Sequence, residues 1–420
     1  MIYDNTPPVL DNVTIKSNNS NNWMAKKNDT VTLQIIASEN LKNTNLQCYS
    51  GSFTSTTSSS CIDSKIYLFG DDNNTTQVTP NQITGTNFRQ YTMSRVFSTA
   101  SPITSQAGDN VTFSIEFEDY AGNKGVLANS TTDNTTVTYD DQNPILSPIK
   151  IISDNTNSSS ESPDKRLAMP GDNVTLTFST PENLDDLVLN FANNTVVPTL
   201  AGQDYTFVKT MDTSDTSKNF NGCTNTTTIT GCQIPFQMTA TDFAGNQSTH
   251  NQDDTTDNSS VKFDGVAPNL NPVNFKTDNC NERAGKVNDN QTLSVTSSEP
   301  LLESSVMVHF FTDNGTHQDN FTSNNSSDLI SISFTGTSGD LVSRNMFAAK
   351  RMFKNTDVEG AIKFYTSFTD PAGNFNENLN TTTDTSSVTF DRTIPVLTNI
   401  SISTDNDPGF DNQSMPGTLI

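Results

Sequence analysis

The stretch VTFSIEFEDYAGN, residues 111–123, decides the fold predicted for this chain. Val111, Phe113, Ile115 and Phe117 alternate with polar residues, and this period of two predicts a strand with one buried face. The Asp-x-Ala-Gly-Asn word that ends the stretch predicts a turn. Aspartate accepts hydrogen bonds from nearby backbone groups, and glycine adopts positive φ without steric penalty.

The same stretch occurs twice more, as IPFQMTATDFAGN (234–246) and IKFYTSFTDPAGN (362–374). Its aspartate is Asp119, Asp242 and Asp370 in turn, which gives spacings of 123 and 128 residues. Repeats of this length predict a tandem array of whole domains, because solenoid repeats are only about 20–50 residues long.

Three further words recur in the same order around each copy. A short strand ends on an aspartate, as in SVKFD at 260–264, and a proline-containing strand follows, as in APNLNPVNF at 267–275. A strand of the type GDNVTL (171–176) then leads into a bend that contains a glutamate. No segment has a convincing helical face, so many short strands with turn signals predict antiparallel β-sandwiches.

Domain boundaries are predicted at the aspartates that end the closing strands. Residues 1–4 are expected to end a preceding repeat, and residues 392–420 to contribute the first strands of a fourth, incomplete one. Residues 5–140, 141–264 and 265–391 are expected to form three complete repeats. We therefore predict an all-β chain of tandem sandwiches in an elongated array, cut from a longer precursor or processed to a mature product.

Composition narrows the function. The formal net charge of −24 argues against nucleic-acid binding, which needs clustered lysine and arginine. Hydrophobic residues make up only 32% of the chain, a value often associated with disorder. Their regular alternation argues against disorder here, because thin sandwiches of half-buried strands need few apolar residues. No run of about 18 apolar residues occurs, so no membrane-spanning helix is predicted.

Catalytic residues are not expected. The three histidines, His250, His309 and His317, do not recur between repeats, and nucleophile-elbow, zinc-protease and phosphate-loop motifs are absent from the sequence. A carboxylate pair for glycoside cleavage stays an alternative, since the chain has 47 acidic residues. However, the acids that recur fall in turns and linkers. We predict that the chain is not an enzyme and needs no cofactor.

The recurrent aspartates have two interpretations. In the first, the Asp-x-Ala-Gly-Asn word is only a turn that leaves a core strand. In the second, its aspartates bind Ca²⁺ together with the linker aspartates, because carboxylate and carbonyl oxygens suit a hard cation. The residues concerned are Asp119, Asp242 and Asp370, with Asp140, Asp264 and Asp391. The spacing is not that of an EF-hand, so no metal ligand is assigned from sequence and calcium stays an alternative.

Cysteine spacing predicts two disulfides, Cys48 with Cys61 and Cys223 with Cys232. Metal binding is the rival interpretation, but no C-x-x-C motif occurs. Persistent disulfides indicate an oxidising compartment outside the cytoplasm. Cys280 is left over, and we expect it to be a buried thiol, with a link to another chain as the alternative.

Asn-x-Ser/Thr sequons predict covalent N-linked glycans. Asn173 and Asn290 occupy the same place in two repeats, on the strand face opposite the buried residues, and Asn134 and Asn258 precede the closing strands equivalently. An asparagine-rich surface without glycans is the alternative. The candidates are Asn12, Asn28, Asn110, Asn134, Asn173, Asn193, Asn225, Asn258, Asn290, Asn314, Asn320, Asn380 and Asn399.

The G-D-x-V-x-L strand, the glutamate after it and the D-x-A-G-N word together resemble the tandem immunoglobulin-like repeats of large extracellular, adhesin-type surface proteins. The resemblance rests on about 40 positions in each repeat and implies an immunoglobulin-like sandwich. It also implies a role as stalk, spacer, adhesin or fibre subunit. The chain departs from the bacterial pattern in its cysteines and in long insertions such as residues 43–80.

These features together predict a non-enzymatic extracellular structural glycoprotein. It would be a subunit of a fibre or surface coat, assembled head to tail from copies of itself, with strand complementation between subunits. One alternative is the stalk of a cell-surface adhesin, and another is a calcium-stiffened spacer.

Overall fold

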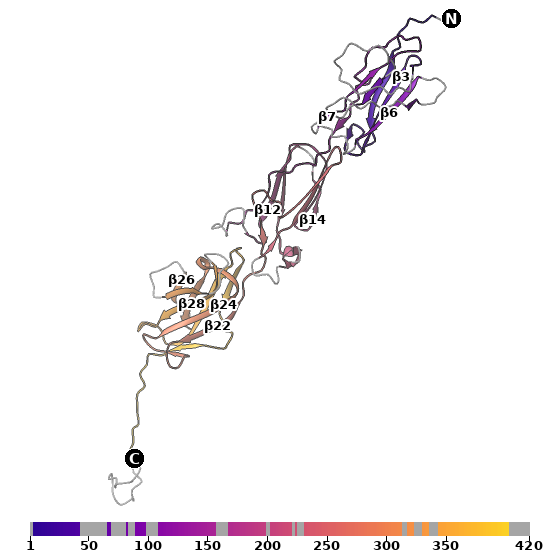
Figure 1. Cartoon of the computed structure of the whole chain (residues 1–420). Helices are drawn as coiled ribbons and strands as arrows, with labels where there is room; N and C mark the ends of the chain where they lie inside the picture. Colours follow the sequence, from indigo (N-terminus) through magenta and orange to yellow (C-terminus); the bar gives the residue numbers. More distant parts are fainter. Residues whose placement is uncertain are drawn as a thin grey trace, which may run out of the picture. The chain divides into compact units, whose positions relative to one another are not determined.

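The structure is a computed structural model, drawn in Figure 1, and the coloured ribbon there marks the described residues. These are 3–42, 65–68, 81–82, 89–97, 108–156, 167–198, 202–220, 223–224, 231–312, 317–322, 330–335 and 343–402. The chain divides into two compact units. The first holds residues 1–224 and 232–263, and the second holds residues 225–231 and 264–420. The first unit contains repeats 1 and 2, and the second contains repeat 3.

Repeat 1 is a sandwich of two sheets. One has the order β1 (Leu10–Ser17), β3 (Thr30–Ala37), β6 (Gln90–Val96) and β5 (Asn81–Gln82). The opposite side is formed by β2 (Met24–Ala25), β9 (Thr138–Tyr139) and β7 (Asp109–Asn110), together with the pair β4 (Lys65–Leu68) and β8 (Phe113–Glu116).

Repeat 2 repeats this plan. One sheet has the order β10 (Ile149–Ser153), β12 (Asn173–Ser179) and β15 (Asp204–Thr210). The other side contains β14 (Asn194–Val196), β13 (Leu184–Phe191), β19 (Phe236–Asp242) and β20 (Gln247–Asn251), with β11 (Leu167–Ala168), β21 (Lys262–Phe263) and β18 (Cys232–Gln233) beside them. A small pair, β16 (Asn219–Phe220) and β17 (Cys223–Thr224), follows the 3₁₀ helix η2 (Thr213–Ser217).

Repeat 3 has the most continuous sheets. The first has the order β22 (Leu270–Thr277), β24 (Asn290–Leu302), β28 (Ser343–Met352) and β27 (Ile330–Thr335). The second has the order β23 (Ala284–Gly285), β31 (Val388–Phe390), β29 (Gly360–Thr369), β25 (Met307–Thr312) and β26 (His317–Thr322), and β30 (Phe375–Leu379) also pairs with β29. The short 3₁₀ helix η3 (Glu303–Ser305) precedes β25.

One pairing is common to all three repeats. The short second strand lies parallel to the closing strand, as β2 to β9, β11 to β21 and β23 to β31, whereas the other strand pairings in the described part of the chain are antiparallel. The second strand ends in Ala25, Ala168 or Gly285, each fully buried or nearly so. At Gly285 an added Cβ would lie 2.3 Å from the buried ring of Phe353, so this side of the sandwich takes only the smallest side chains.

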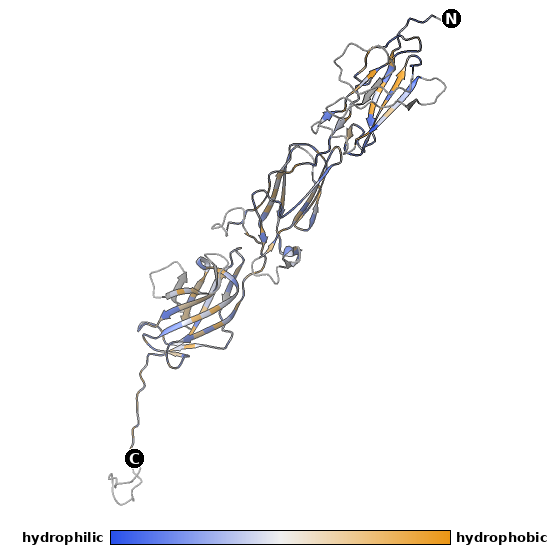
Figure 2. Cartoon of the chain, in the orientation of Figure 1, coloured by the Kyte–Doolittle hydropathy of each residue, from blue (hydrophilic) through white to orange (hydrophobic). Residues whose placement is uncertain are grey.

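The hydrophobic residues form three separate cores, one inside each repeat. Figure 2 shows hydrophobic residues along the strands, interrupted by hydrophilic ones. The predicted alternation is confirmed, since Phe113, Phe236 and Phe364 are buried with the other apolar residues of their strands. Burying one such side chain stabilises the fold by about 1.5–3 kcal/mol. The prediction of tandem immunoglobulin-like antiparallel sandwiches is therefore confirmed.

Residues 392–402 form no strand among the described residues. Ile394, Val396, Leu397, Ile400 and Ile402 are exposed, although Ile400 and Ile402 match residues of β1, β10 and β22 that are buried. Their place in a fourth repeat stays a prediction, and residues 403–420 lie outside the described residues. No helix in the described part of the chain is long and apolar enough to cross a membrane.

Candidate metal centres

The Asp-x-Ala-Gly-Asn word closes on itself through hydrogen bonds. In repeat 2, Asn246 donates its backbone N–H to Asp242 Oδ1 at 2.8 Å and its side-chain Nδ2 to Asp242 Oδ2 at 2.9 Å. Gly245 has φ +82° and donates its N–H to the carbonyl of Asp242. The predicted turn is confirmed: the aspartate carboxylate accepts from the asparagine four positions on, and the glycine adopts positive φ.

The other two repeats contain the same loop. Asn123 donates to both carboxylate oxygens of Asp119, at 2.8 and 2.7 Å. Asn374 does the same to Asp370, at 2.9 and 2.8 Å, and Gly373 adds a third donor at 2.7 Å. The three aspartates are almost completely buried. Each therefore stands in one orientation, set by its own loop.

The same asparagines bring the linker aspartates to these loops. Asn246 Nδ2 donates to the Asp140 carbonyl at 2.9 Å, while the backbone N–H of Asp140 donates to the Ala25 carbonyl of repeat 1 at 2.8 Å. Asn374 Nδ2 donates to the Asp264 carbonyl at 3.0 Å, and Asn123 Nδ2 to the Asp4 carbonyl at 3.3 Å. A linker aspartate thus joins the loop of the repeat that follows it.

A glutamate completes each group. Glu39, Glu182 and Glu299 come from the bend after β3, after β12 and within β24. In each of the three groups, one carboxylate oxygen per residue lies within 4.8 Å of one from each of the other two. The groups are site 1 (Asp4, Glu39, Asp119), site 2 (Asp140, Glu182, Asp242) and site 3 (Asp264, Glu299, Asp370).

The sequence pointed to two of the three members at sites 2 and 3, but at site 1 only to Asp119, since Asp4 was not among the calcium candidates. It named both kinds of aspartate, but it did not assign a role to the glutamates. Their recurrence after the G-D-x-V-x-L strand was the available signal, since an acid at one place in three repeats suggests a shared task. Asp391 has no such partners among the described residues, although its backbone N–H donates to the Gly285 carbonyl as that of Asp140 does to Ala25.

Site 3 is the most desolvated group. Its three carboxylates are at most 5% exposed. Burial, with the negative charges of Asp264 and Asp370, raises the pKa of Glu299 to about 8. Burial and the charge of Asp370 raise the pKa of Asp264 to about 7, and burial also raises the pKa of Asp370 despite its hydrogen bonds. Three carboxylates this close cannot all stay ionised without a nearby positive charge.

The carboxylates of site 2 are more exposed to solvent than those of site 3, and site 1 includes an exposed one. Burial raises the pKa of Asp140 and Glu182 at site 2, and the charge of Asp242 adds to both shifts. At site 1, Asp4 is exposed, and the pKa of Glu39 is raised by burial and by Asp4 and Asp119 against the opposing charge of Arg89. Burial would raise the pKa of Asp119, but the hydrogen bonds of its loop outweigh burial and lower it.

The carboxylate of Glu299 receives no hydrogen bond or ion pair from the described residues, although only 5% of this residue is exposed. A buried charge without a partner is costly, so groups of this kind normally pair or coordinate a metal. All the donors are oxygens, which suits Ca²⁺ or Mg²⁺ rather than Zn²⁺ or copper. The three sites are therefore candidate centres for a hard divalent cation.

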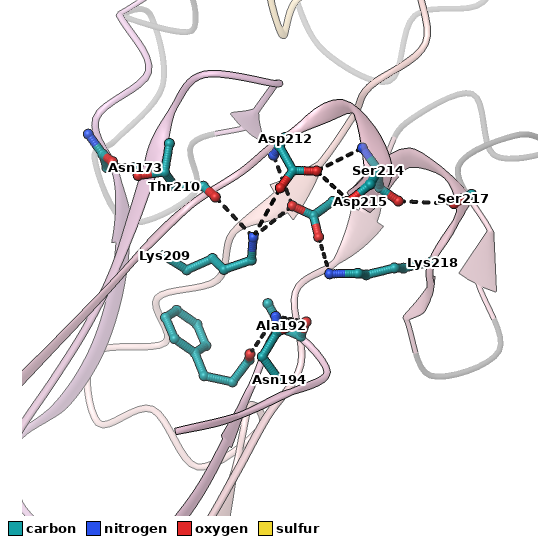
Figure 3. A network of polar contacts seen from close by, with 11 residues as sticks. Asn173, Ala192, Asn194, Lys209, Thr210, Asp212, Ser214, Asp215, Ser217 and Lys218 are labelled. Carbon is teal, nitrogen blue, oxygen red and sulfur yellow. Dashed lines mark hydrogen bonds and ion pairs between the residues drawn. The ribbon is translucent and has the colours of Figure 1, made fainter. Parts of the chain in front are cut away.

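A contrasting acidic cluster in repeat 2 carries its own counter-charges (Figure 3). The fully buried Asp215 forms ion pairs with Lys209 at 2.9 Å and Lys218 at 2.5 Å. It also closes a capping box with Asp212 at the start of η2. Burial would raise the pKa of Asp215, but the lysine hydrogen bonds outweigh it and lower the pKa. This network is satisfied within the protein and leaves no need for a cation.

The predicted disulfides are described only in part. Cys232 is disulfide-bonded, whereas the side chain of Cys223 and all of Cys48 and Cys61 lie outside the described residues, so both pairings stay predictions. The expectation of a buried thiol at Cys280 is wrong, because Cys280 is free and exposed. It lies in the turn between β22 and β23, where the chain leaves the core.

Most of the predicted glycan sites are accessible. Asn12, Asn28, Asn110, Asn134, Asn193, Asn258, Asn380 and Asn399 are exposed. Asn173 and Asn290 are half-buried, and each donates its Nδ2 to an aspartate, Asp154 at 2.8 Å and Asp278 at 2.7 Å. Asn225, Asn314 and the side chain of Asn320 lie outside the described residues. Whether any of them carries a glycan stays a prediction.

No protein-family model matches the sequence, and no curated protein matches it. Among solved structures, the chain is similar to the crystal structure of the I9–I11 tandem from titin, with a TM-score of 0.24 and 9% sequence identity. The match covers 90% of this chain and 98% of that chain. At this TM-score the likeness assigns no residue or role, so the fold rests on the strand order and buried faces described above.

Proposed function

We propose that this chain is a non-enzymatic structural protein whose immunoglobulin-like repeats are stiffened at their joints by Ca²⁺. The observation that carries the proposal is the threefold recurrence of a linker aspartate, a bend glutamate and a loop aspartate with oxygens within 4.8 Å. A cation bound there would hold the linker residue, and so the end of one repeat, to the repeat that follows.

The ligands of the three sites are all carboxylate oxygens, partly exposed at sites 1 and 2, and such a set suits calcium. Ca²⁺ binds oxygens at about 2.3–2.6 Å, so two ligands on opposite sides of the ion lie up to about 5 Å apart. Mg²⁺ binds at about 2.0–2.1 Å and would require opposite ligands only about 4 Å apart, in a stricter octahedron. Three carboxylates supply up to six oxygens, and water would complete the calcium shell at the wetter sites.

The three sites should differ in affinity. Site 3 is the most buried, and no lysine or arginine among the described residues offsets its charge, so its attraction for a cation is strongest. Site 1 contains the exposed Asp4 and feels the positive charge of Arg89, so it should bind most weakly. The expected order is site 3, site 2, site 1.

Calorimetric titration of the full, chelator-stripped chain with Ca²⁺ tests the proposal. We expect at least one exothermic or endothermic binding event, together with a rise in unfolding temperature, because a ligand that binds only the folded state stabilises it. Glu299→Gln should remove the tightest event. The matched control is Asp391→Asn, a linker aspartate that belongs to none of the three carboxylate groups, and it should leave calcium binding unchanged. Absence of both binding heat and thermal shift would overturn the calcium proposal.

The larger assembly we propose is an extracellular fibre or surface coat. Copies of the chain would join head to tail, and strand complementation would cover Ile400 and Ile402, whose equivalents in the three repeats are buried strand residues. An adhesin stalk would use the same joints to carry a binding module. Electron microscopy at high protein concentration separates the two, because uniform monomers would contradict the fibre.

A further inference from the structure

The Asp-x-Ala-Gly-Asn loop of repeat 2 makes contacts on two sides. On one side, Asp242 contributes its carboxylate to site 2. On the other side, three successive carbonyls of the same loop accept hydrogen bonds from repeat 1. Asn21 Nδ2 donates to Phe243, Asn19 Nδ2 to Ala244 and Lys26 Nζ to Gly245.

Asn19 Nδ2 is oriented within repeat 1 by Asp29, and the same carboxylate anchors the backbone of Lys26, whose side-chain ammonium reaches the loop. Asp29 Oδ2 accepts from Asn19 Nδ2 at 2.7 Å and from the backbone N–H of Lys26 at 2.8 Å. Asn19 Nδ2 then donates its second hydrogen to the Ala244 carbonyl at 2.9 Å. A donor that is already oriented loses little freedom when it binds, so these contacts define the position of the loop rather than follow it.

The hydrogen bond from an asparagine side chain to an aspartate carboxylate, Asn19 to Asp29 in repeat 1, has an equivalent in every repeat. Asn155 donates to Asp172 at 2.6 Å, and Asn279 donates to Asp289 at 2.7 Å. The lysine is not general, because Lys26 corresponds to Met169 in repeat 2 and to Lys286 in repeat 3. Repeat 1 therefore presents a set of hydrogen-bond donors to the loop of repeat 2. One of them, the ammonium group of Lys26, has no equivalent in repeat 2, where Met169 stands at this place.

We infer that docking of repeat 1 through Lys26 and Asn19 and cation binding at site 2 strengthen each other, with these two residues acting as positioning residues. The inference rests on the proposed function. Asp140 belongs to the linker after repeat 1, and Asp242 belongs to the loop of repeat 2. The Asn246 side chain donates to the carbonyl of Asp140 and to the carboxylate of Asp242, and so connects the two. Fixing the loop from the repeat 1 side brings both carboxylates to one place, and a bound cation would in turn hold the loop against repeat 1.

The coupling is reciprocal by thermodynamic necessity, and couplings of this kind typically change affinity by about 5- to 150-fold. Lys26 holds the loop through the Gly245 carbonyl rather than through a carboxylate of site 2. Its removal should therefore weaken cation binding. Were repulsion between Lys26 and the cation dominant, the same removal would strengthen it.

The test uses the full chain carrying Glu39→Gln and Glu299→Gln, which leaves site 2 as the one complete group among those described. Calcium titration of this background should give one binding event. Adding Lys26→Met, the residue that repeat 2 has at this place, should lower its affinity about 5-fold or more, and Lys26→Arg should restore it. Lys286→Met is the matched control and should leave the affinity unchanged.

A second experiment measures the distance between repeats 1 and 2 directly. Spin labels at Lys16→Cys and Val208→Cys, both exposed positions, are introduced with Cys280→Ser. Calcium should narrow the distance distribution between the labels, and Lys26→Met should reduce this narrowing. Binding that is unaffected by Lys26→Met would overturn the coupling alone. A background that binds no Ca²⁺ would overturn both the coupling and calcium binding at site 2, while the titration of the unmodified chain decides the proposed function.

Discussion

The side-chain amide of Asn246 donates a hydrogen bond of 2.9 Å to the carbonyl of Asp140, 106 residues earlier in the chain. The same amide also donates to Asp242 Oδ2 at 2.9 Å. One side chain therefore holds a linker residue and a loop carboxylate together, and this arrangement brings the members of site 2 to one place.

Replacing this asparagine should loosen the site. Asn246→Ala removes both amide bonds, and we expect unfolding of repeat 2 to become about 1–2 kcal/mol easier, with weaker calcium binding at site 2. Asn374→Ala should act likewise at site 3, whereas Asn123→Ala should have the smallest effect because Asp4 is exposed. Denaturant unfolding and calcium titration of the three variants measure the order. Equal effects at all three would contradict it.

Repeat 3 should be less stable at pH 8 than at pH 5 when calcium is removed. The pKa values of Asp264 and Glu299 are raised in the folded protein, to about 7 and about 8, so the folded state binds more protons than the unfolded chain between about pH 4 and pH 8. Stability therefore falls as pH rises through this window, by an amount of the order of a few kcal/mol.

Thermal unfolding in chelator across this pH range is the measurement. Glu299→Gln should flatten the dependence, since glutamine carries no charge to desolvate. Calcium should restore stability at pH 8, because it replaces the protons as the counter-charge. A chelated protein whose repeat 3 gains stability from pH 5 to pH 8 would show that the three carboxylates are not desolvated as described.

The Asp215 network should respond with the opposite sign. Asp215→Asn leaves Lys209 and Lys218 without their shared carboxylate, and we expect a loss of about 2–3 kcal/mol, moderated because both lysines reach water. The pKa of Asp215 is lowered, so its contribution is present above about pH 4 and is lost as pH falls further. Urea unfolding at pH 7 and pH 3, with the exposed Asp185→Asn as control, checks both points.

Replacing Gln291 should increase the stability of repeat 3. It is completely buried, and neither its amide nitrogen nor its amide oxygen has a hydrogen-bond partner among the described residues. The matching positions in repeats 1 and 2 are Val31 and Val174, both buried. Gln291→Val should therefore stabilise repeat 3 by about 1 kcal/mol, since it removes an unsatisfied amide from the core. A lower denaturation midpoint for this variant would show that Gln291 has a partner.

Native protein should carry glycans at exposed sequons. Asn134 and Asn258 occupy equivalent turns with φ of 60° and 57° and are exposed, so an added sugar would meet solvent. We expect an intact mass above 45.7 kDa that falls in sugar-sized steps on enzymatic deglycosylation. A bare mass, with all cysteines titrating as free thiols, would contradict the extracellular proposal.

The sandwich architecture could be predicted from sequence because its signal is local. Alternation in Val111–Phe117 and its two copies, and the recurrence of four ordered words, need no knowledge of distant contacts. The positive φ of Gly122, Gly245 and Gly373 likewise follows from a five-residue word. Exposure of Cys280 could not be predicted in this way, because free cysteines are usually buried and this one lies in a turn outside the core.

The carboxylate sites were decided by tertiary structure. The sequence contained every member, and the aspartates of both kinds were recognised, but Asp119 could have been matched with Asp140 of its own repeat. Folding instead places each loop aspartate beside the linker that precedes its own repeat, and not beside the linker that follows it. Glu299 lies in β24, whereas Asp370 follows β29 of the other sheet, 71 residues later, so the packing of the two sheets brings them together. The burial of Glu299 without a partner among the described residues is a property of the packed protein that residue order alone does not determine.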